Sequence, residues 1–143
     1  QTDPSDALRG ISFFEKNSQP KKIFVKGRRY GRPIMDIFFT IGMALFESLL
    51  LRKLMWDINA QPTMFHRNFF NTWSLPPNDF SLDLYAYYIE KKKGLEVMRF
   101  PVHFGKRVHG VSHWNKSLLA KYRFIMRTLT YSFELRKRFK KNA

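Results

Sequence analysis

The chain has 143 residues and carries 26 Lys and Arg against 11 Asp and Glu, which leaves a formal net charge of +15. Its aromatic content of 17% excludes a disordered polycation, and the absence of Cys excludes a disulfide scaffold, a Cys-bound zinc site and a thiol nucleophile. The charge predicts anionic partners, which are nucleic acid, a lipid surface or phosphorylated small molecules.

The first third of the chain is expected to run from a helix through a short strand into a long apolar helix. Asp3-Pro4 is typical of a helix start, and apolar residues then recur at helical spacing up to Asn17. A short strand, Ile23–Val25, is expected next, and a basic loop with two glycines, Gly27–Pro33, follows it. A long helix is predicted over Ile34–Trp56, buried or placed at a lipid interface because it is apolar almost all round.

That apolar stretch is expected to stop short of spanning a membrane. Four polar residues interrupt it: Asp36, Thr40, Glu47 and Ser48. The apolar runs between these residues, such as Ile41–Phe46, are much shorter than the roughly 18–20 apolar residues that a spanning helix needs. We therefore expect no part of these 143 residues to cross a bilayer by itself.

The second half is predicted to alternate strands with helices. The expected elements are a strand at Thr63–Phe65, a helical turn at Arg67–Phe70, a helix at Phe80–Lys93 that closes at Gly94, and a strand at Leu95–Phe104. A second basic loop, 105–113, leads to a helix that Asn115 caps. One face of this last helix is apolar, with Leu118, Tyr122, Ile125, Leu129 and Phe133. Alternating elements of this kind predict an α/β fold.

The two basic loops are candidate anion sites. In the first, Lys26, Arg28, Arg29 and Arg32 lie among glycines that would let the backbone approach a phosphate. In the second, Lys106, Arg107 and Ser112 suit an anion better than the three nearby His residues suit a metal, because the His spacing matches no metal motif. A solvated loop in a very basic protein is the alternative for both.

Three acids lie near loops, and their expected roles differ. Asp79 is expected to cap the helix at Phe80, and Asp83 lies in the first turn of that helix, where the helix dipole favours an acid. Asp57 follows a helix end and has no such structural role, so it is a candidate general base.

Four blocks in order resemble the C-terminal half of a family 2 glycosyltransferase catalytic domain, of the polyprenyl-phosphate (dolichyl-phosphate mannosyltransferase-like) kind. The first two, Gln1–Pro4 and Lys26–Tyr30, resemble the end of the metal-binding stretch and the Gly-Ser-Arg-Tyr phosphate loop. The third runs from Phe80 to Phe104 and resembles a helix, a glycine and a Val-Pro-Ile-x-Phe strand. The fourth, Arg107–Trp114, resembles an Arg-x-x-Gly-x-Ser-Lys loop.

The resemblance implies a GT-A type fold, with a Rossmann-like mixed sheet that binds a nucleotide-sugar and a divalent metal, Mg or Mn. It implies that the sugar is transferred to a polyprenyl phosphate or to a glycan of a cell-envelope pathway, usually with inversion at the anomeric carbon. It also implies a peripheral enzyme at the cytoplasmic face of an anionic membrane. Gln1 would lie at the metal. The phosphate-binding residues would be Lys26, Arg28, Arg29, Arg107, Ser112 and His113.

Some residues depart from the family pattern and leave the acceptor open. Asp36 stands where a second phosphate-binding Arg is expected, and 61–65 reads Gln-Pro-Thr-Met-Phe in place of a Ser-Gly-Phe-Arg type stretch. A lipid-phosphate acceptor is already an anion and needs no strong base. A sugar hydroxyl would need one, and then Asp57 or Asp83 becomes the catalytic candidate.

The resemblance also implies that 1–114 is the C-terminal half of the catalytic domain and that 115–143 is a basic amphipathic helical tail. We therefore expect the isolated chain to lack transferase activity. Two other classes stay open: a basic nucleic-acid-binding module, although no known motif of that kind is present and no nucleic acid partner is expected, and a non-catalytic protein of a membrane surface.

Overall fold

The structure is a computed structural model that describes residues 3–105 and 118–141. Its helices are α1 (Ser5–Lys16), α2 (Ile34–Leu51), α3 (Arg67–Phe70), α4 (Leu82–Lys93) and α5 (Leu118–Lys141), with a 3-10 turn at Pro20–Lys22. Its strands are β1 (Ile23–Tyr30), β2 (Thr63–Phe65) and β3 (Glu96–His103). This order of elements confirms the α/β class.

The three strands form one mixed sheet in the order β2-β1-β3. The central strand, β1, pairs in parallel with β3 along its whole length, from Ile23 opposite Glu96 to Tyr30 opposite His103. It pairs antiparallel with the short strand β2, with Val25 opposite Met64. The parallel pair brings the carboxyl ends of β1 and β3 to the same edge of the sheet.

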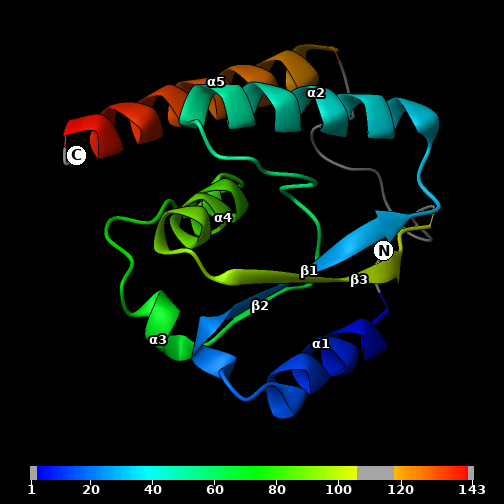
Figure 1. Cartoon of the computed structure of the whole chain (residues 1–143). Coiled ribbons are helices and arrows are strands. Elements are labelled where there is room, and N and C mark those ends of the chain that lie inside the picture. Colours follow the sequence, from blue (N-terminus) through cyan, green and yellow to red (C-terminus); the bar gives the residue numbers. More distant parts are fainter. Residues whose placement is uncertain (1–2, 106–117, 142–143) are drawn as a thin grey trace.

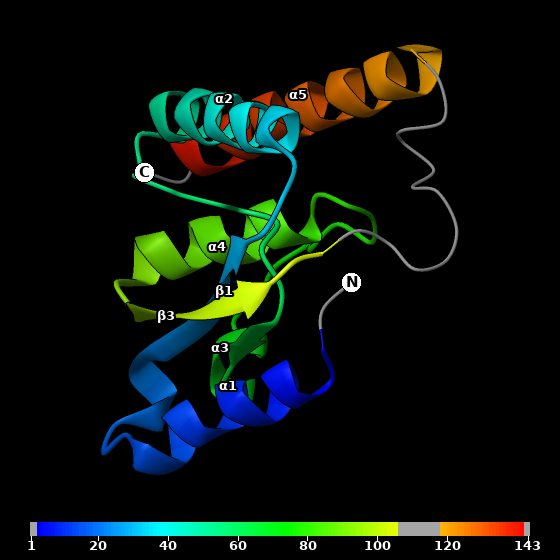
Figure 2. The same ribbon diagram turned by 90° about the vertical axis from the view of Figure 1, so that its right-hand side faces the viewer.

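Helices cover the sheet in layers, as Figures 1 and 2 show. The α4 helix lies on one face of the sheet and α1 on the other, and α2 and α5 lie side by side beyond α4. The alternation of β1 matches these layers, because Phe24 joins the core on the α4 side while Ile23 and Val25 join a smaller core with Phe13 and Phe14 of α1.

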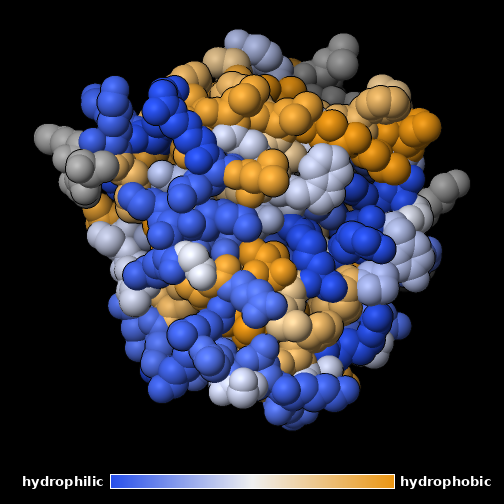
Figure 3. Space-filling model, in the orientation of Figure 1, coloured by the Kyte–Doolittle hydropathy of each residue, from blue (hydrophilic) through white to orange (hydrophobic). Residues whose placement is uncertain are grey.

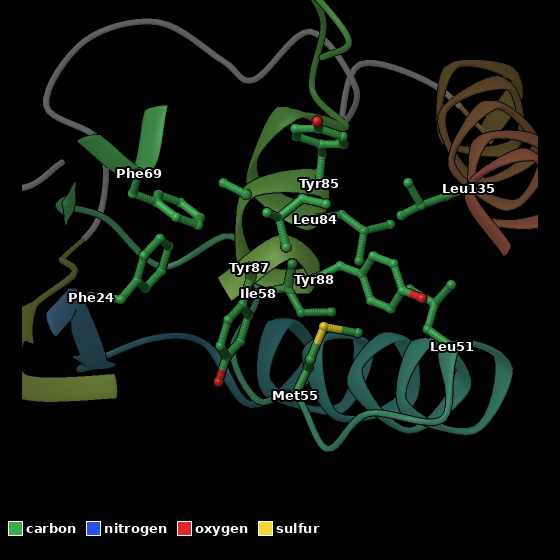
Figure 4. Packing of buried hydrophobic residues seen from close by; sticks show 12 residues of the cluster. Phe24, Leu51, Met55, Ile58, Phe69, Leu84, Tyr85, Tyr87, Tyr88 and Leu135 are labelled. Atoms are coloured by element: carbon green, nitrogen blue, oxygen red, sulfur yellow. The ribbon is translucent and has the colours of Figure 1, made fainter. Parts of the chain in front are cut away.

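The main core is built around α4. In Figure 4, Leu84, Tyr85, Tyr87 and Tyr88 of α4 lie between Phe24 and Phe69 on one side and Leu51, Met55 and Leu135 on the other. Tyr85 satisfies its buried hydroxyl by donating to the carbonyl of Ser74 and accepting from the amide of the same residue. The core therefore joins the sheet, α4 and the α2–α5 layer.

Two predicted boundaries were wrong. The first strand does not end at Gly27 but continues to Tyr30, because β3 offers a parallel partner for each of its residues. The long helix ends at Leu51 instead of Trp56, since Arg52 adopts a left-handed conformation and the Ser48 hydroxyl bonds both backbone groups of Met55. That bond turns the chain back toward the core.

The buried face of α5 also differs from the predicted apolar face. Phe124, Ser132 and Leu135 are its buried residues, whereas Tyr122 and Phe133 of the predicted face are more than half exposed. The domain boundary predicted at residue 114 lies outside the described residues. The helix that follows it packs on α2 and adds Leu135 to the main core.

Glu90 is expected to make the stability of the fold depend on pH. Both carboxylate oxygens of this α4 residue are buried without a hydrogen bond from a described residue, and Lys91 Nζ lies 3.9 Å from one of them. Burial raises the pKa of Glu90 to about 7. At pH values between the ordinary Glu pKa of about 4.3 and this raised value, Glu90 loses its proton only in the unfolded state. The free energy of unfolding therefore falls as the pH rises through this range.

Glu90→Gln is therefore expected to raise the free energy of unfolding by about 1–3 kcal/mol near pH 8.5 and to leave it nearly unchanged near pH 5. Urea denaturation of both proteins at the two pH values measures the difference. An equal change in the free energy of unfolding at both pH values would show that the charge of Glu90 does not cause the change.

Candidate functional site

The candidate site lies at the carboxyl edge of the parallel strands, where open α/β sheets commonly bind ligands. The segment 57–62, between α2 and β2, runs beside β1 there. It makes two backbone contacts with that strand: the Arg29 amide donates to Asp57 Oδ2 at 3.4 Å, and the Gly27 amide donates to the Pro62 carbonyl at 3.0 Å.

Gly27 serves this contact and not an anion. A Cβ at Gly27 would lie 2.2 Å from the Gln61 carbonyl oxygen, which is too close for any side chain. The prediction that this glycine lets the backbone approach a phosphate was wrong, because the chain's own backbone occupies that space. Residues 27–30 of the predicted loop are instead the second half of a strand, and only 31–33 lie outside it.

Arg29 and Asp57 form a buried ion pair. The Arg29 guanidinium donates from Nε to Asp57 Oδ1 at 3.0 Å and from Nη2 to the same oxygen, and the two side chains are 11% and 3% exposed. Arg32 Nη2 lies 3.9 Å from the same oxygen. Arg29 lies near the end of β1 and Arg32 just after it, and Asp57 is the acid that both guanidinium groups approach.

The chemistry of Asp57 follows from these contacts. Burial alone would raise the pKa of Asp57, but the hydrogen bonds and charge of Arg29, together with the charge of Arg32, hold it below its ordinary value. An acid in this state is a weak proton acceptor near neutral pH. The environment therefore suits Asp57 for holding Arg29 in position better than for general base catalysis.

Lys26 and Asp83 form the second half of the site. Lys26 is fully buried and donates from Nζ to the Thr63 hydroxyl at 2.7 Å. Burial lowers the pKa of Lys26 to about 8, against the charge of Asp83, which favours the protonated amine. Asp83 accepts both of its hydrogen bonds from the Gln61 amide, at 2.9 Å each.

Asp83 differs from Asp57 in its electrostatics. Burial raises the pKa of Asp83, and the charge of Lys26 and the bond from Gln61 oppose this only in part. A carboxylate with a raised pKa is the better proton acceptor of the two. We call Lys26, Arg29, Arg32, Asp57 and Asp83 together the charge cluster.

Arg99 connects the charge cluster to the surrounding elements, and the sequence did not reveal it. This β3 residue lies opposite Lys26 and donates to the Gly27 carbonyl, the Trp56 carbonyl and the Tyr87 hydroxyl. Its guanidinium also lies over the Tyr87 ring, 5.6 Å from the centroid. In the sequence, Arg99 is an arginine at an inward position of an apolar strand. This pattern does not indicate which groups its guanidinium bonds.

The other predicted site residues divide into two groups. Arg28 is exposed and outside the charge cluster, while Tyr30 and His103, at the ends of β1 and β3, bring their rings to 5.3 Å. The remaining predicted residues lie outside the described part of the chain: Gln1, Lys106, Arg107, Ser112 and His113. Asp79, predicted as a helix cap, accepts a hydrogen bond from the Ser81 amide in the turn before α4.

A divalent metal finds no set of ligands in the described residues. Within 3–105 and 118–141, no three His, Asp or Glu side chains gather at one point. Asp57 and Asp83, the two acids of the charge cluster, already accept hydrogen bonds from Arg29 and Gln61. The described part of the site therefore has cations that suit a phosphate, but it has no set of ligands for a metal ion.

A second surface feature is the apolar face of the α2–α5 layer. By length and composition alone α2 could cross a membrane, contrary to our expectation, and only 22% of it is buried in the fold. Figure 3 shows apolar side chains gathered along the top edge, over these helices. Those exposed by more than half include Ile34, Met35, Phe38, Leu45, Leu49, Tyr122 and Phe133.

Comparison of the chain with models of known protein families gives no match, and comparisons with curated proteins and with solved structures give none either.

Proposed function

We propose that this chain belongs to a GT-A type glycosyltransferase that moves a sugar from a nucleotide-sugar to a polyprenyl phosphate or a glycan acceptor, with inversion. The observation that supports it best is the charge cluster. Three cations and two carboxylates lie between the middle of β1 and the residues just after its carboxyl end, and Lys26 and Asp57 are buried there. The excess of positive charge suits a phosphorylated substrate.

In this proposal the arginines stabilise the leaving group. The anomeric carbon–oxygen bond to the diphosphate breaks, a new bond to the acceptor oxygen forms, and the nucleoside diphosphate carries the negative charge away. Asp57 holds the Arg29 guanidinium by Nε and Nη2, which fixes its plane for paired bonds to phosphate oxygens. Arg32 adds a second cation beside it.

The metal that the resemblance implies, Mg or Mn, has no ligand set among the described residues, so no step is assigned to it. Gln1 remains the proposed residue beside it. Bound there, a divalent ion would neutralise charge on the diphosphate.

The apolar face of the α2–α5 layer supports a peripheral position at a membrane, and the resemblance implies its cytoplasmic side. Basic residues of α5, among them Arg123, Arg136, Lys137 and Lys140, lie at exposed positions on the same layer as the apolar side chains. Apolar side chains flanked by cations are typical of a helix that lies in an anionic lipid interface. This position would present the enzyme to a lipid-linked acceptor.

The test is sugar transfer by the full-length gene product, with labelled nucleotide-sugars, Mg or Mn, and three acceptors: a polyprenyl phosphate, the same polyprenol without phosphate, and a glycan. We expect a labelled product with the lipid phosphate or the glycan and none with the free polyprenol. No product with any donor and acceptor, from protein shown to be folded, would refute the proposal.

Asp83→Asn distinguishes the two acceptor classes. A phosphate acceptor needs no base, so the variant should keep kcat within a few-fold. A hydroxyl acceptor must give up its proton, and the loss of Asp83 should then lower kcat by about 10²–10⁴-fold. In that case the wild-type rate should also rise with pH through the raised pKa of Asp83, because only the ionised acid accepts a proton.

A further inference from the structure

The α2–α5 contact contains a buried carboxyl that plays no part in the proposed reaction. Glu47 of α2 and Ser132 of α5 are both fully buried, and Ser132 Oγ lies 2.5 Å from Glu47 Oε1. It is a polar bond between two helices that otherwise meet through apolar side chains such as Phe46 and Phe133, whose rings pack edge to face.

The proton count of this contact fixes its chemistry. Ser132 Oγ also lies 2.8 Å from the carbonyl oxygen of Thr128, which can only accept. A hydroxyl has one proton, so Ser132 cannot donate to both oxygens. If its proton goes to Thr128, as serine hydroxyls in helices commonly donate to the preceding turn, the short contact to Glu47 needs a proton from the carboxyl. The geometry therefore favours a neutral Glu47.

The surroundings of Glu47 disfavour its ionised form. Its second oxygen, Oε2, is buried without a hydrogen bond from a described residue. The nearby charged residues of α5, namely Arg127, Glu134 and Arg136, occupy exposed positions, and Asp36 lies at the far end of α2. Burial raises the pKa of Glu47 to about 7, and no charged group contributes. Only a Ser132 hydroxyl that donated to the carboxylate would oppose this increase.

The buried phenols of this core stay neutral over the same pH range, and Glu90 of α4 is the other buried carboxyl whose pKa burial raises to about 7. Tyr88 of α4 and Tyr131 of α5 are phenols, and burial raises the pKa of each above its ordinary value of about 10. Neither can supply or remove charge beside Glu47 near neutral pH. Glu47 is the one of these two carboxyls that lies in the contact between α2 and α5, so the Glu47→Gln background separates its effect from that of Glu90.

A cavity lies beside Glu47 between the two helices. The cavity has a volume of about 260 Å³. Its lining comes from both helices, with Phe39, Gly42, Met43, Phe46 and Glu47 from α2 and Ile125, Thr128 and Leu129 from α5. An ionised Glu47 would gain the missing hydrogen bonds only from water entering between these apolar side chains, and that entry separates the helices.

We propose that Glu47 is a neutral acid that donates its proton to Ser132, and that this bond is a proton-dependent latch that closes α2 onto α5. Loss of the proton opens the layer and exposes the lining of the cavity. The latch is independent of the proposed transferase reaction, because none of the charge cluster takes part in it.

The test uses the absence of Cys in the chain, which allows two spin labels to be placed at Leu49→Cys and Arg136→Cys, both exposed positions on the two helices. In the wild-type background the label-to-label distance distribution should lengthen and broaden as the pH rises, with a midpoint near pH 7. Glu47→Gln keeps a neutral donor to Ser132 and should stay closed throughout. A distribution that does not change with pH, or the same change in the Gln background, would overturn the latch.

A second measurement needs no labels. The carboxyl carbon signal of Glu47, assigned by its absence from the spectrum of Glu47→Gln, should titrate near pH 7. A midpoint near the ordinary Glu value of about 4.3 would overturn the proposal even if both helices stayed together.

Discussion

Replacing Asp57 with Asn is expected to lower the free energy of unfolding by about 3–5 kcal/mol. Asn has nearly the same shape and tolerates the positive φ of 44° at this position, so the backbone keeps its conformation. The change leaves Arg29 and Arg32 beside each other, largely buried, with no carboxylate to compensate them. Denaturant unfolding measures the loss.

Two controls connect the loss to the ion pair. Arg29→Met should be costly alone, but Asp57→Asn combined with Arg29→Met should cost clearly less than the sum of the two. The effect of Asp57→Asn should be complete near neutral pH and should shrink as the pH falls through the lowered pKa of Asp57, because the wild-type acid is then protonated too. A loss below about 0.5 kcal/mol at neutral pH would mean that the pair does not hold the site together.

Phe24→Ala should have an effect of similar size for a different reason. The Phe24 ring is fully buried in β1, stacks on Phe65 and Tyr87 and packs edge to face on Phe69. Its removal leaves a cavity in the centre of the main core, and such truncations cost about 3–5 kcal/mol. The midpoint of urea unfolding, at unchanged slope, reports this loss.

The matched control is Phe38→Ala on α2. Phe38 is 62% exposed, so the same chemical change there should alter the free energy of unfolding in water by about 0.5 kcal/mol or less. If the two variants were equally unstable, the assignment of Phe24 to the core would be contradicted.

The sequence predicted the elements well where a local pattern determines them. Thr63–Phe65, Arg67–Phe70 and the end of α4 at Gly94 were all expected, because alternation, turn residues and a left-handed glycine are local signals. The two boundary errors have non-local causes. The second half of β1 depends on β3, more than sixty residues later, and the end of α2 depends on the bonds between Ser48 and Met55.

The site was predictable as a set of residue types but not as an arrangement. Asp57, Asp83, Lys26 and Arg29 were each named from their chemistry, and the fold brings them together. The sequence could not show that Asp57 is bound to Arg29, because 28 residues separate them. Nor could it show that Lys26 is buried, since a basic loop and a strand end look alike in a chain of this charge.

The most direct test of the proposed site is photo-crosslinking of the full-length protein with a photoreactive polyprenyl phosphate and with a photoreactive nucleoside diphosphate, followed by peptide mapping. The account predicts that at least one probe labels the peptides around 26–32, 57–63 or 83, and that inorganic diphosphate in excess suppresses the labelling. Labelling confined to α5, or labelling of the same peptides by single-stranded RNA but by neither probe, would contradict it.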